Sequence, residues 1–189
     1  MAAASWQAAR TMTSAHRDLY RAFAKYNTRF NRQIYDLVRG LTDAQRKRDM
    51  GAFFGSVDGT LQHILLADRI WLSRLRASGH DFPALEEANM TFEVQSLRDS
   101  VAADFAGLER ERVATDQLIA AWVEDLTDEI LAAPLRYKNF AGQDREHAVW
   151  IAVSHLFNHQ THHRGQVTTL LKQLGVDPGV TDFLVFALA

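Results

Sequence analysis

One apolar stripe near the start of the chain limits the folds available to it. From Leu19 to Leu41, large apolar residues recur every three or four positions, the spacing that places side chains on one face of an α-helix. The stripe consists of Leu19, Phe23, Tyr26, Phe30, Ile34, Leu37 and Leu41. We therefore predict one long helix from Ser14 to Gly40, where the glycine ends it. Such a helix has to bury its stripe against other helices or a sheet.

Three more helical patterns follow. The second helix is expected to begin at Ser56, a good N-cap residue, and to end near Ser78 and Gly79. The third is expected over about 93–126. The fourth should run over about 146–174, because Gly175 follows its last apolar residue. Four amphipathic helices in 189 residues predict an all-α fold, a four-helix bundle that forms a single domain over residues 1–189.

The connecting segments carry turn residues and short patterns. We expect a helical turn at residues 42–45, a loop over 79–91, and a loop or short hairpin over 133–144 that crosses the end of the bundle. The tail, TDFLVFALA, is too apolar for a free end. It is expected to pack as a short helix or to form part of a partner contact.

Composition excludes several classes of function. The net charge of −2 offers no basic excess for phosphate binding, so a nucleic-acid binder is not expected. The chain has no cysteine, which excludes thiolate ligation, disulfides and cysteine nucleophiles. No run of about 18 apolar residues predicts a membrane span, and the start lacks the order of a secretory signal. The cytoplasm is therefore the expected location.

Four of the eight histidines lie in one stretch, HLFNHQTHHRGQV, within the fourth predicted helix. At about 100° per residue, His163 falls near the middle of the core-facing arc and His159 at its margin. His155 and His162 fall on one flank, where they are expected to support the site or to lie on the surface. His159 and His163 lie four residues apart, which stacks them one turn above each other. Two imidazoles at this spacing can ligate one metal ion.

A metal site needs a third ligand from elsewhere. The stretch has Gln160 where HExxH proteases have glutamate, which disfavours that class of enzyme. His63 is the best candidate, because it lies in the middle of the second helix beside an apolar arc. Interior imidazoles are costly unless they have a partner, and metal ligation is one way to satisfy them. Three neutral histidines would leave a fourth position open for water or substrate.

Other readings of these residues stay open. An i, i+4 histidine pair can be incidental, and the three histidines could point apart in a metal-free bundle. Asn158, Gln160 and Gln166 could accept the second N–H of the imidazoles or could be solvated. Asp58, Asp68 and His162 are guesses for a general base. His16, His80 and His147 receive no role. Charge runs such as RERVATD are expected to be solvated helix faces, and no P-loop, GxSxG or paired ExxH motif occurs.

These stretches carry a family resemblance. HLFNHQTHHRGQV and MGAFFGSVDGTLQHILLADRIWL (Met50–Leu72) resemble the DinB family of damage-inducible proteins, which is related to the YfiT-like metal-dependent hydrolases. The similarity covers nearly the whole chain, including YNTRFNRQIYDLV and LRYKN. Many members have histidine where this chain has Asp58 and Thr168, which leaves the roles of those two positions undefined.

The resemblance implies a four-helix bundle, often a homodimer, with a divalent metal ion held by His63, His159 and His163. Related members are thiol-dependent S-transferases or isomerases that use low-molecular-weight thiols such as bacillithiol or mycothiol. Zn²⁺ or Ni²⁺ is the expected ion, and zinc suits three imidazoles in a tetrahedral site. We therefore expect a metal-dependent enzyme of the transferase or hydrolase type with one open coordination position. The alternative is a stress-related bundle that binds metal without catalysis.

Overall fold

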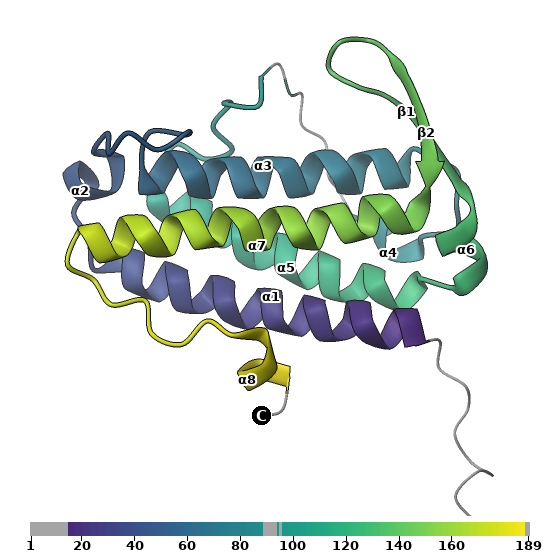
Figure 1. Cartoon of the computed structure of the whole chain (residues 1–189). Coiled ribbons are helices and arrows are strands. Elements are labelled where there is room, and N and C mark those ends of the chain that lie inside the picture. Colours follow the sequence, from purple (N-terminus) through teal and green to yellow (C-terminus); the bar gives the residue numbers. More distant parts are fainter. Residues whose placement is uncertain (1–14, 89–93, 95, 188–189) are drawn as a thin grey trace, which may run out of the picture.

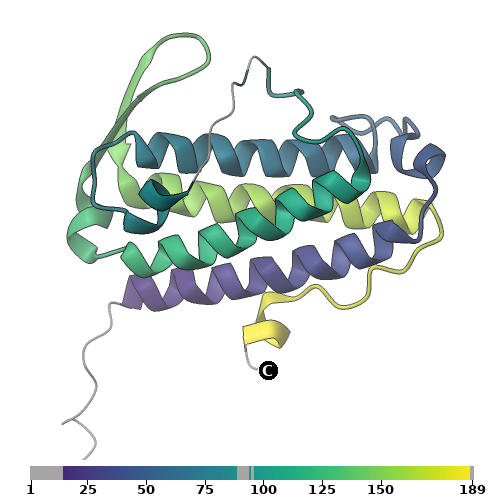
Figure 2. The ribbon, with the colours of Figure 1, turned by 180° about the vertical axis from the view of Figure 1, so that it is seen from behind.

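The computed structural model describes residues 15–88, 94 and 96–187. Its four long helices are α1 (Ala15–Arg39), α3 (Val57–Arg76), α5 (Phe105–Trp122) and α7 (Val149–Gln173). They lie side by side, with α1 and α7 running in one direction and α3 and α5 in the other (Figures 1 and 2). Contacts join α1 to α5, α5 to α3, α3 to α7 and α7 to α1, so each long helix packs against two others in a closed ring. The fold is therefore the predicted all-α four-helix bundle.

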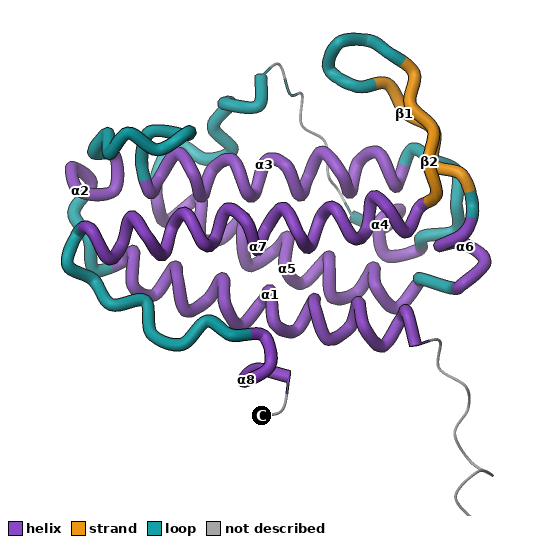
Figure 3. Tube along the Cα trace, viewed as in Figure 1, coloured by secondary structure: helices purple, strands orange, loops and turns teal. Residues whose placement is uncertain are grey.

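Shorter elements lie at the ends of this bundle or along its side. They are α2 (Asp43–Lys47), α4 (Pro83–Glu87), the 3₁₀ turn η1 (Val123–Asp125), α6 (Asp128–Ala132), β1 (Pro134–Lys138), β2 (Asp144–Ala148) and α8 (Phe183–Ala187). α8 packs along the side of α1, and the others lie at the ends (Figure 1). The two antiparallel strands form a hairpin that projects from the end of the bundle just before α7 (Figure 3). This hairpin confirms one of the two predicted forms of that segment. None of the described helices is long and apolar enough to cross a membrane.

Several predicted boundaries agree with the structure. α3 begins after Ser56, whose hydroxyl accepts a hydrogen bond from the Gly59 N–H. The predicted turn is α2, which Thr42 caps through its side chain. The tail forms α8, where Phe183 and Phe186 pack their rings against Tyr26 of α1. The alternative of a partner contact is untested.

The third helix begins later than predicted. Residues 96–104 form no helix, and α5 begins at Phe105 after Asp104, whose carboxylate accepts the Gly107 N–H at 2.6 Å. The buried side chain of Gln62 holds this segment, because its Oε1 accepts the Val101 N–H at 2.8 Å. Residues 93 and 95 of the predicted helix lie outside the described residues. The prediction of a helix over 96–104 was wrong because a side chain of α3 pairs with the backbone that a helix would use.

Three smaller predictions were also wrong. Residues 146–148 are strand rather than helix, because they pair with β1, and α7 begins at Val149. The predicted loop over 79–91 contains α4, which begins at Pro83; its residues 89–91 lie outside the described part. Leu19, the first residue of the apolar stripe, is 43% exposed because Tyr20 and Ala24 carry the buried face at this end of α1.

The core consists of two apolar clusters, and a polar layer lies between them along the bundle axis. One cluster gathers around Trp122 and Phe82, and the other around Phe30 and Leu65. The polar layer has a side chain from each long helix, and all its members are buried: Asn27, Asn31, Asp68, Arg112, Thr115, Asp116, Gln160 and Arg164. RERVATD supplies three of them, so the prediction of a solvated face was wrong for that run.

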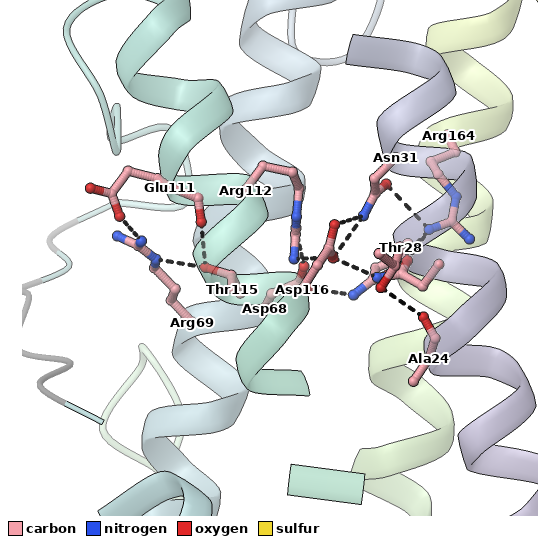
Figure 4. Close-up of polar contacts among 12 residues, drawn as sticks. Ala24, Thr28, Asn31, Asp68, Arg69, Glu111, Arg112, Thr115, Asp116 and Arg164 are labelled. Atoms are coloured by element: carbon pink, nitrogen blue, oxygen red, sulfur yellow. Dashed lines mark hydrogen bonds and ion pairs between the residues drawn. The ribbon is translucent and has the colours of Figure 1, made fainter. Parts of the chain in front are cut away.

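Hydrogen bonds and ion pairs connect the buried layer from helix to helix (Figure 4). Arg112 of α5 lies between two carboxylates, those of Asp68 on α3 and Asp116 on its own helix. Asp116 also accepts the side-chain amide of Asn31 at 3.0 Å. On the other side, Asp68 Oδ1 accepts the Gln160 amide of α7 at 2.8 Å. This last bond sets the register between α3 and α7, the two helices that carry the candidate site.

Candidate metal centre

The structure brings His63, His159 and His163 together. One ring nitrogen from each lies within 4.8 Å of the other two, and the Nε2 atoms of His63 and His159 are 3.1 Å apart. Two ligands of a tetrahedral zinc ion lie about 3.3 Å apart, because zinc–nitrogen bonds are about 2.0–2.1 Å long. No fourth His, Cys, Asp or Glu of the described residues joins the group. The donor set thus fits a divalent ion with an open position.

Two of the three imidazoles have a hydrogen-bond partner at Nδ1. His63 Nδ1 lies 3.0 Å from the Leu97 carbonyl oxygen, and His163 Nδ1 lies 2.8 Å from Gln166 Oε1. Both partners are acceptors, so the proton belongs on Nδ1 in each ring. The Nε2 lone pairs are then free to face the centre of the group, which is the tautomer that a metal ligand needs.

Burial keeps these rings neutral. Burial and then the charges of His163 and His63 lower the pKa of His159 to about 3. Burial also lowers the pKa of His63 and of His163, although the bonds to Leu97 and to Gln166 each oppose that effect. Neutral imidazoles near pH 7 are the form that binds metal ions.

Phe54 closes one side of the group. Its ring stacks on His63 with centroids 3.7 Å apart and an interplanar angle of 18°. Gly59 permits this contact, because a Cβ at that position would lie 2.2 Å from the Phe54 carbonyl oxygen. The glycine in the first turn of α3 therefore lets the preceding loop approach the histidines.

The three histidines line a cleft of about 560 Å³ between α3, α7, the hairpin and the residue 53–54 loop. Most of its other lining residues are aromatic or apolar, and its polar members include His155, His162, Gln166, Asn139 and Arg74. None of the described lining residues is acidic. A mostly apolar cleft with a few converging polar groups is the usual form of a small-molecule site.

The remaining sequence candidates divide between the cleft and the core. His155 and His162 line the cleft from exposed positions, and the His155 ring packs 5.0 Å from Trp71. Of the three possible supporting amides, Gln166 contacts an imidazole of the group, Gln160 binds Asp68 instead, and Asn158 is exposed.

The three guesses for a general base also differ in place. Asp68 is fully buried against Arg112, so it cannot reach a substrate. Asp58 is not among the residues that line the cleft, and burial raises the pKa of its carboxyl. His162 lines the cleft and receives a 3.2 Å contact from Gln166 Nε2.

Sequence reasoning missed the Leu97 carbonyl, Phe54, Arg74 and Tyr137. A backbone carbonyl has no sequence signal. In the helix predicted over residue 97, the Leu97 carbonyl would have been bonded within the helix. Arg74 carried a signal, because it lies eleven residues after His63, three helical turns along the same face of α3.

The fold and the site define a helical bundle whose cleft is lined by three converging histidines. The sequence profile of the DinB family matches residues 12–189, and the chain belongs to that family. It is also similar to Protein DinB of Bacillus subtilis (strain 168), with 24% identity over 160 residues, which are 84% of this chain and 88% of that protein.

Proposed function

We propose that the protein binds one divalent metal ion, Zn²⁺ or Ni²⁺, through His63, His159 and His163 and uses it in catalysis. The convergence of three imidazole nitrogens within 4.8 Å carries this proposal. Zinc fits three imidazoles with one open position, whereas nickel would need additional water ligands. The cleft beside the histidines favours an enzyme over a bundle that only binds metal, because a purely structural site is closed by a fourth protein ligand.

The reaction class follows from the open position and the cleft. A zinc or nickel ion there would lower the pKa of a bound water or thiol and supply a nucleophile near neutral pH. Since the chain has no cysteine, a thiol would be a low-molecular-weight cosubstrate. Leu97 and Gln166 hold two imidazoles in orientation, while Phe54 and Trp71 give the cleft apolar walls. We therefore propose a thiol-dependent S-transferase or isomerase, or a hydrolase if water is the nucleophile.

Metal content of tag-free protein tests the site. We expect about one zinc or nickel ion per wild-type chain and almost none in His63→Ala, His159→Ala or His163→Ala. His155→Ala and His162→Ala are matched controls, because both histidines lie on α7 and line the same cleft outside the group. Equal metal content in all five variants and the wild type would rule out the proposed ligands.

Activity separates the enzyme from the non-enzymatic alternative. Metal-loaded protein would be assayed for transfer of bacillithiol, mycothiol or glutathione to electrophiles and for ester or amide hydrolysis, with and without chelator. Bound metal together with no chelator-sensitive turnover would support a non-enzymatic metal-binding bundle. Homodimerisation, which the family resemblance implies, is likewise a proposal that light scattering tests.

A further inference from the structure

The far end of the cleft holds a cation in an aromatic setting. The Arg74 guanidinium carbon lies 4.7 Å from the centre of the Trp71 ring and 4.5 Å from that of Tyr137. Phe140 at the hairpin tip lies 5.6 Å away. The Trp71 and Tyr137 rings meet each other at 73°, and cation–π contacts with them leave guanidinium N–H groups available for a planar anion. The α3 helix and the hairpin thus build a pocket around a cation.

Arg74 has no acidic partner within the described parts of the chain. Burial lowers the pKa of Arg74, and the one group that raises it is the Tyr137 phenol. The cleft itself has no acidic lining residue among those described. A half-buried cation without a carboxylate is costly unless a ligand compensates it. Burial and then the charge of Arg74 lower the pKa of the His155 ring.

The geometry of α3 relates this cation to the histidines. His63, Ala67, Ile70 and Arg74 follow one another at intervals of four, three and four residues, and all line the cleft. Arg74 leans back over Trp71, one turn nearer to His63. The guanidinium is therefore about 12 Å from His63 along the helix axis, at 1.5 Å per residue. Between the two ends lie the apolar side chains of Ala67 and Ile70.

We propose that Arg74, held against the rings of Trp71, Tyr137 and Phe140, binds a carboxylate of the substrate or cosubstrate whose reacting end lies at the three histidines. The bridging of Arg74 and the three histidines by one ligand rests on the proposed function, whereas the anion site at Arg74 does not. The ligand class is an elongated organic acid with an apolar middle. Arg74 would determine specificity by selecting ligands that carry a negative charge at the right distance.

The anion site is tested first without metal. Chelator-treated protein is titrated with octanoate or with octanamide, a neutral analogue of the same length, while NMR follows the Arg74 Nε–H resonance. We expect octanoate to shift this resonance and to bind about tenfold more tightly than octanamide, the scale of one charge-assisted hydrogen bond. Equal affinities, or an unperturbed resonance, would overturn the anion site whether or not the protein binds metal.

Two variants, each of which removes one positive charge, test whether Arg74 is the residue that binds the carboxylate. Arg74→Gln should abolish the preference for octanoate, measured by the shifts of backbone amides around the cleft. Arg76→Gln is the matched control, because Arg76 lies on the same helix but is exposed and outside the cleft. Persistence of the preference in Arg74→Gln, or its loss in Arg76→Gln, would contradict the assignment. A merely structural role for Arg74 would weaken both ligands alike.

Bridging is tested with cobalt-loaded protein, in which near-ultraviolet absorption reports the binding of a thiol. We compare 8-mercaptooctanoate with its amide, and 3-mercaptopropionate with its amide. The acid should be preferred over the amide by about tenfold only in the long pair, and Arg74→Gln should remove that preference. Equal preference in both pairs would overturn bridging. Absence of any thiol signal would instead count against the proposed function, and the metal-free titration would still decide the anion site.

Discussion

Gln166 lies three residues after His163 on α7, and its Oε1 atom is 2.8 Å from His163 Nδ1. This acceptor orients the ring and fixes the proton on Nδ1. Gln166→Leu keeps a side chain of similar size but removes the acceptor. We expect the affinity for zinc to fall about 10–100-fold, the usual cost of losing such a supporting bond. Competition against a chromophoric chelator measures this affinity.

Asn158→Leu provides the control for Gln166. Asn158 lies on the same helix, is exposed, and does not line the cleft. Its replacement removes an amide of the same kind without touching the group, so the zinc affinity should stay unchanged. Unchanged affinity in Gln166→Leu would show that the hydrogen bond to His163 does not support metal binding.

Arg112 is the residue whose loss should cost the most stability. It lies between the buried carboxylates of Asp68 and Asp116, and Arg112→Met leaves both without their cation. We expect the free energy of unfolding in urea to fall by about 3–5 kcal/mol. Arg110→Met is the matched control from the same RERVATD run, because Arg110 is exposed. Its effect should stay within about 0.5 kcal/mol; a similar loss in both variants would contradict the role of burial.

At the scale of elements, Gln62 joins α3 to the segment that precedes α5. Its side chain accepts the backbone N–H groups of Val101 and Ala102 and donates to the Ala102 carbonyl. This places the Leu97 carbonyl against His63 Nδ1. Gln62→Met should free the segment, so that zinc affinity falls about 10-fold as His63 loses its acceptor. Hydrogen exchange at residues 101–102 should rise in the same variant.

Gln173→Met is the control for Gln62, because Gln173 is exposed at the end of α7. It should change neither zinc affinity nor hydrogen exchange at residues 101–102. If exchange rises in Gln62→Met while affinity holds, the segment is anchored by Gln62 but the Leu97 carbonyl does not support the site.

Periodicity predicted whole elements where one helix face packs on the bundle. The end of α1 and the start of α3 followed from Gly40 and from Ser56, whereas the predicted start of the first helix at Ser14 lies outside the described residues. The pattern failed at Leu97 and Val101, which lie four residues apart as in a helix but belong to the segment held by Gln62. It also failed for RERVATD, because periodicity does not show that Arg112 and Asp116 find partners on other helices. Helical geometry predicted that His159 and His163 share one face and made His63 the best third candidate. The convergence of the three and the cleft beside them depend on packing that only the fold shows.

For the whole molecule, the group of histidines depends on the packing of α3 against α7. Asp68 lies five residues after His63, and Gln160 follows His159 directly, so their 2.8 Å hydrogen bond fixes the helices beside the site. Apolar clusters lie on both sides of that level. These contacts hold the imidazoles together without a metal bond. We therefore expect the bundle to differ from small zinc domains, in which metal binding provides the folding free energy.

Removal of metal should accordingly leave the bundle folded. Chelator-treated protein should keep its helical circular dichroism and melt cooperatively. Zinc at 100 times its dissociation constant adds about 2.7 kcal/mol to the free energy of unfolding, which raises Tm by about 5–10 °C in a chain of this length. His163→Ala should melt at the same temperature with and without zinc, because it lacks a ligand. Loss of helicity on chelation would contradict this account, since it would mean that the metal, and not the polar layer with its two apolar clusters, holds α3 against α7.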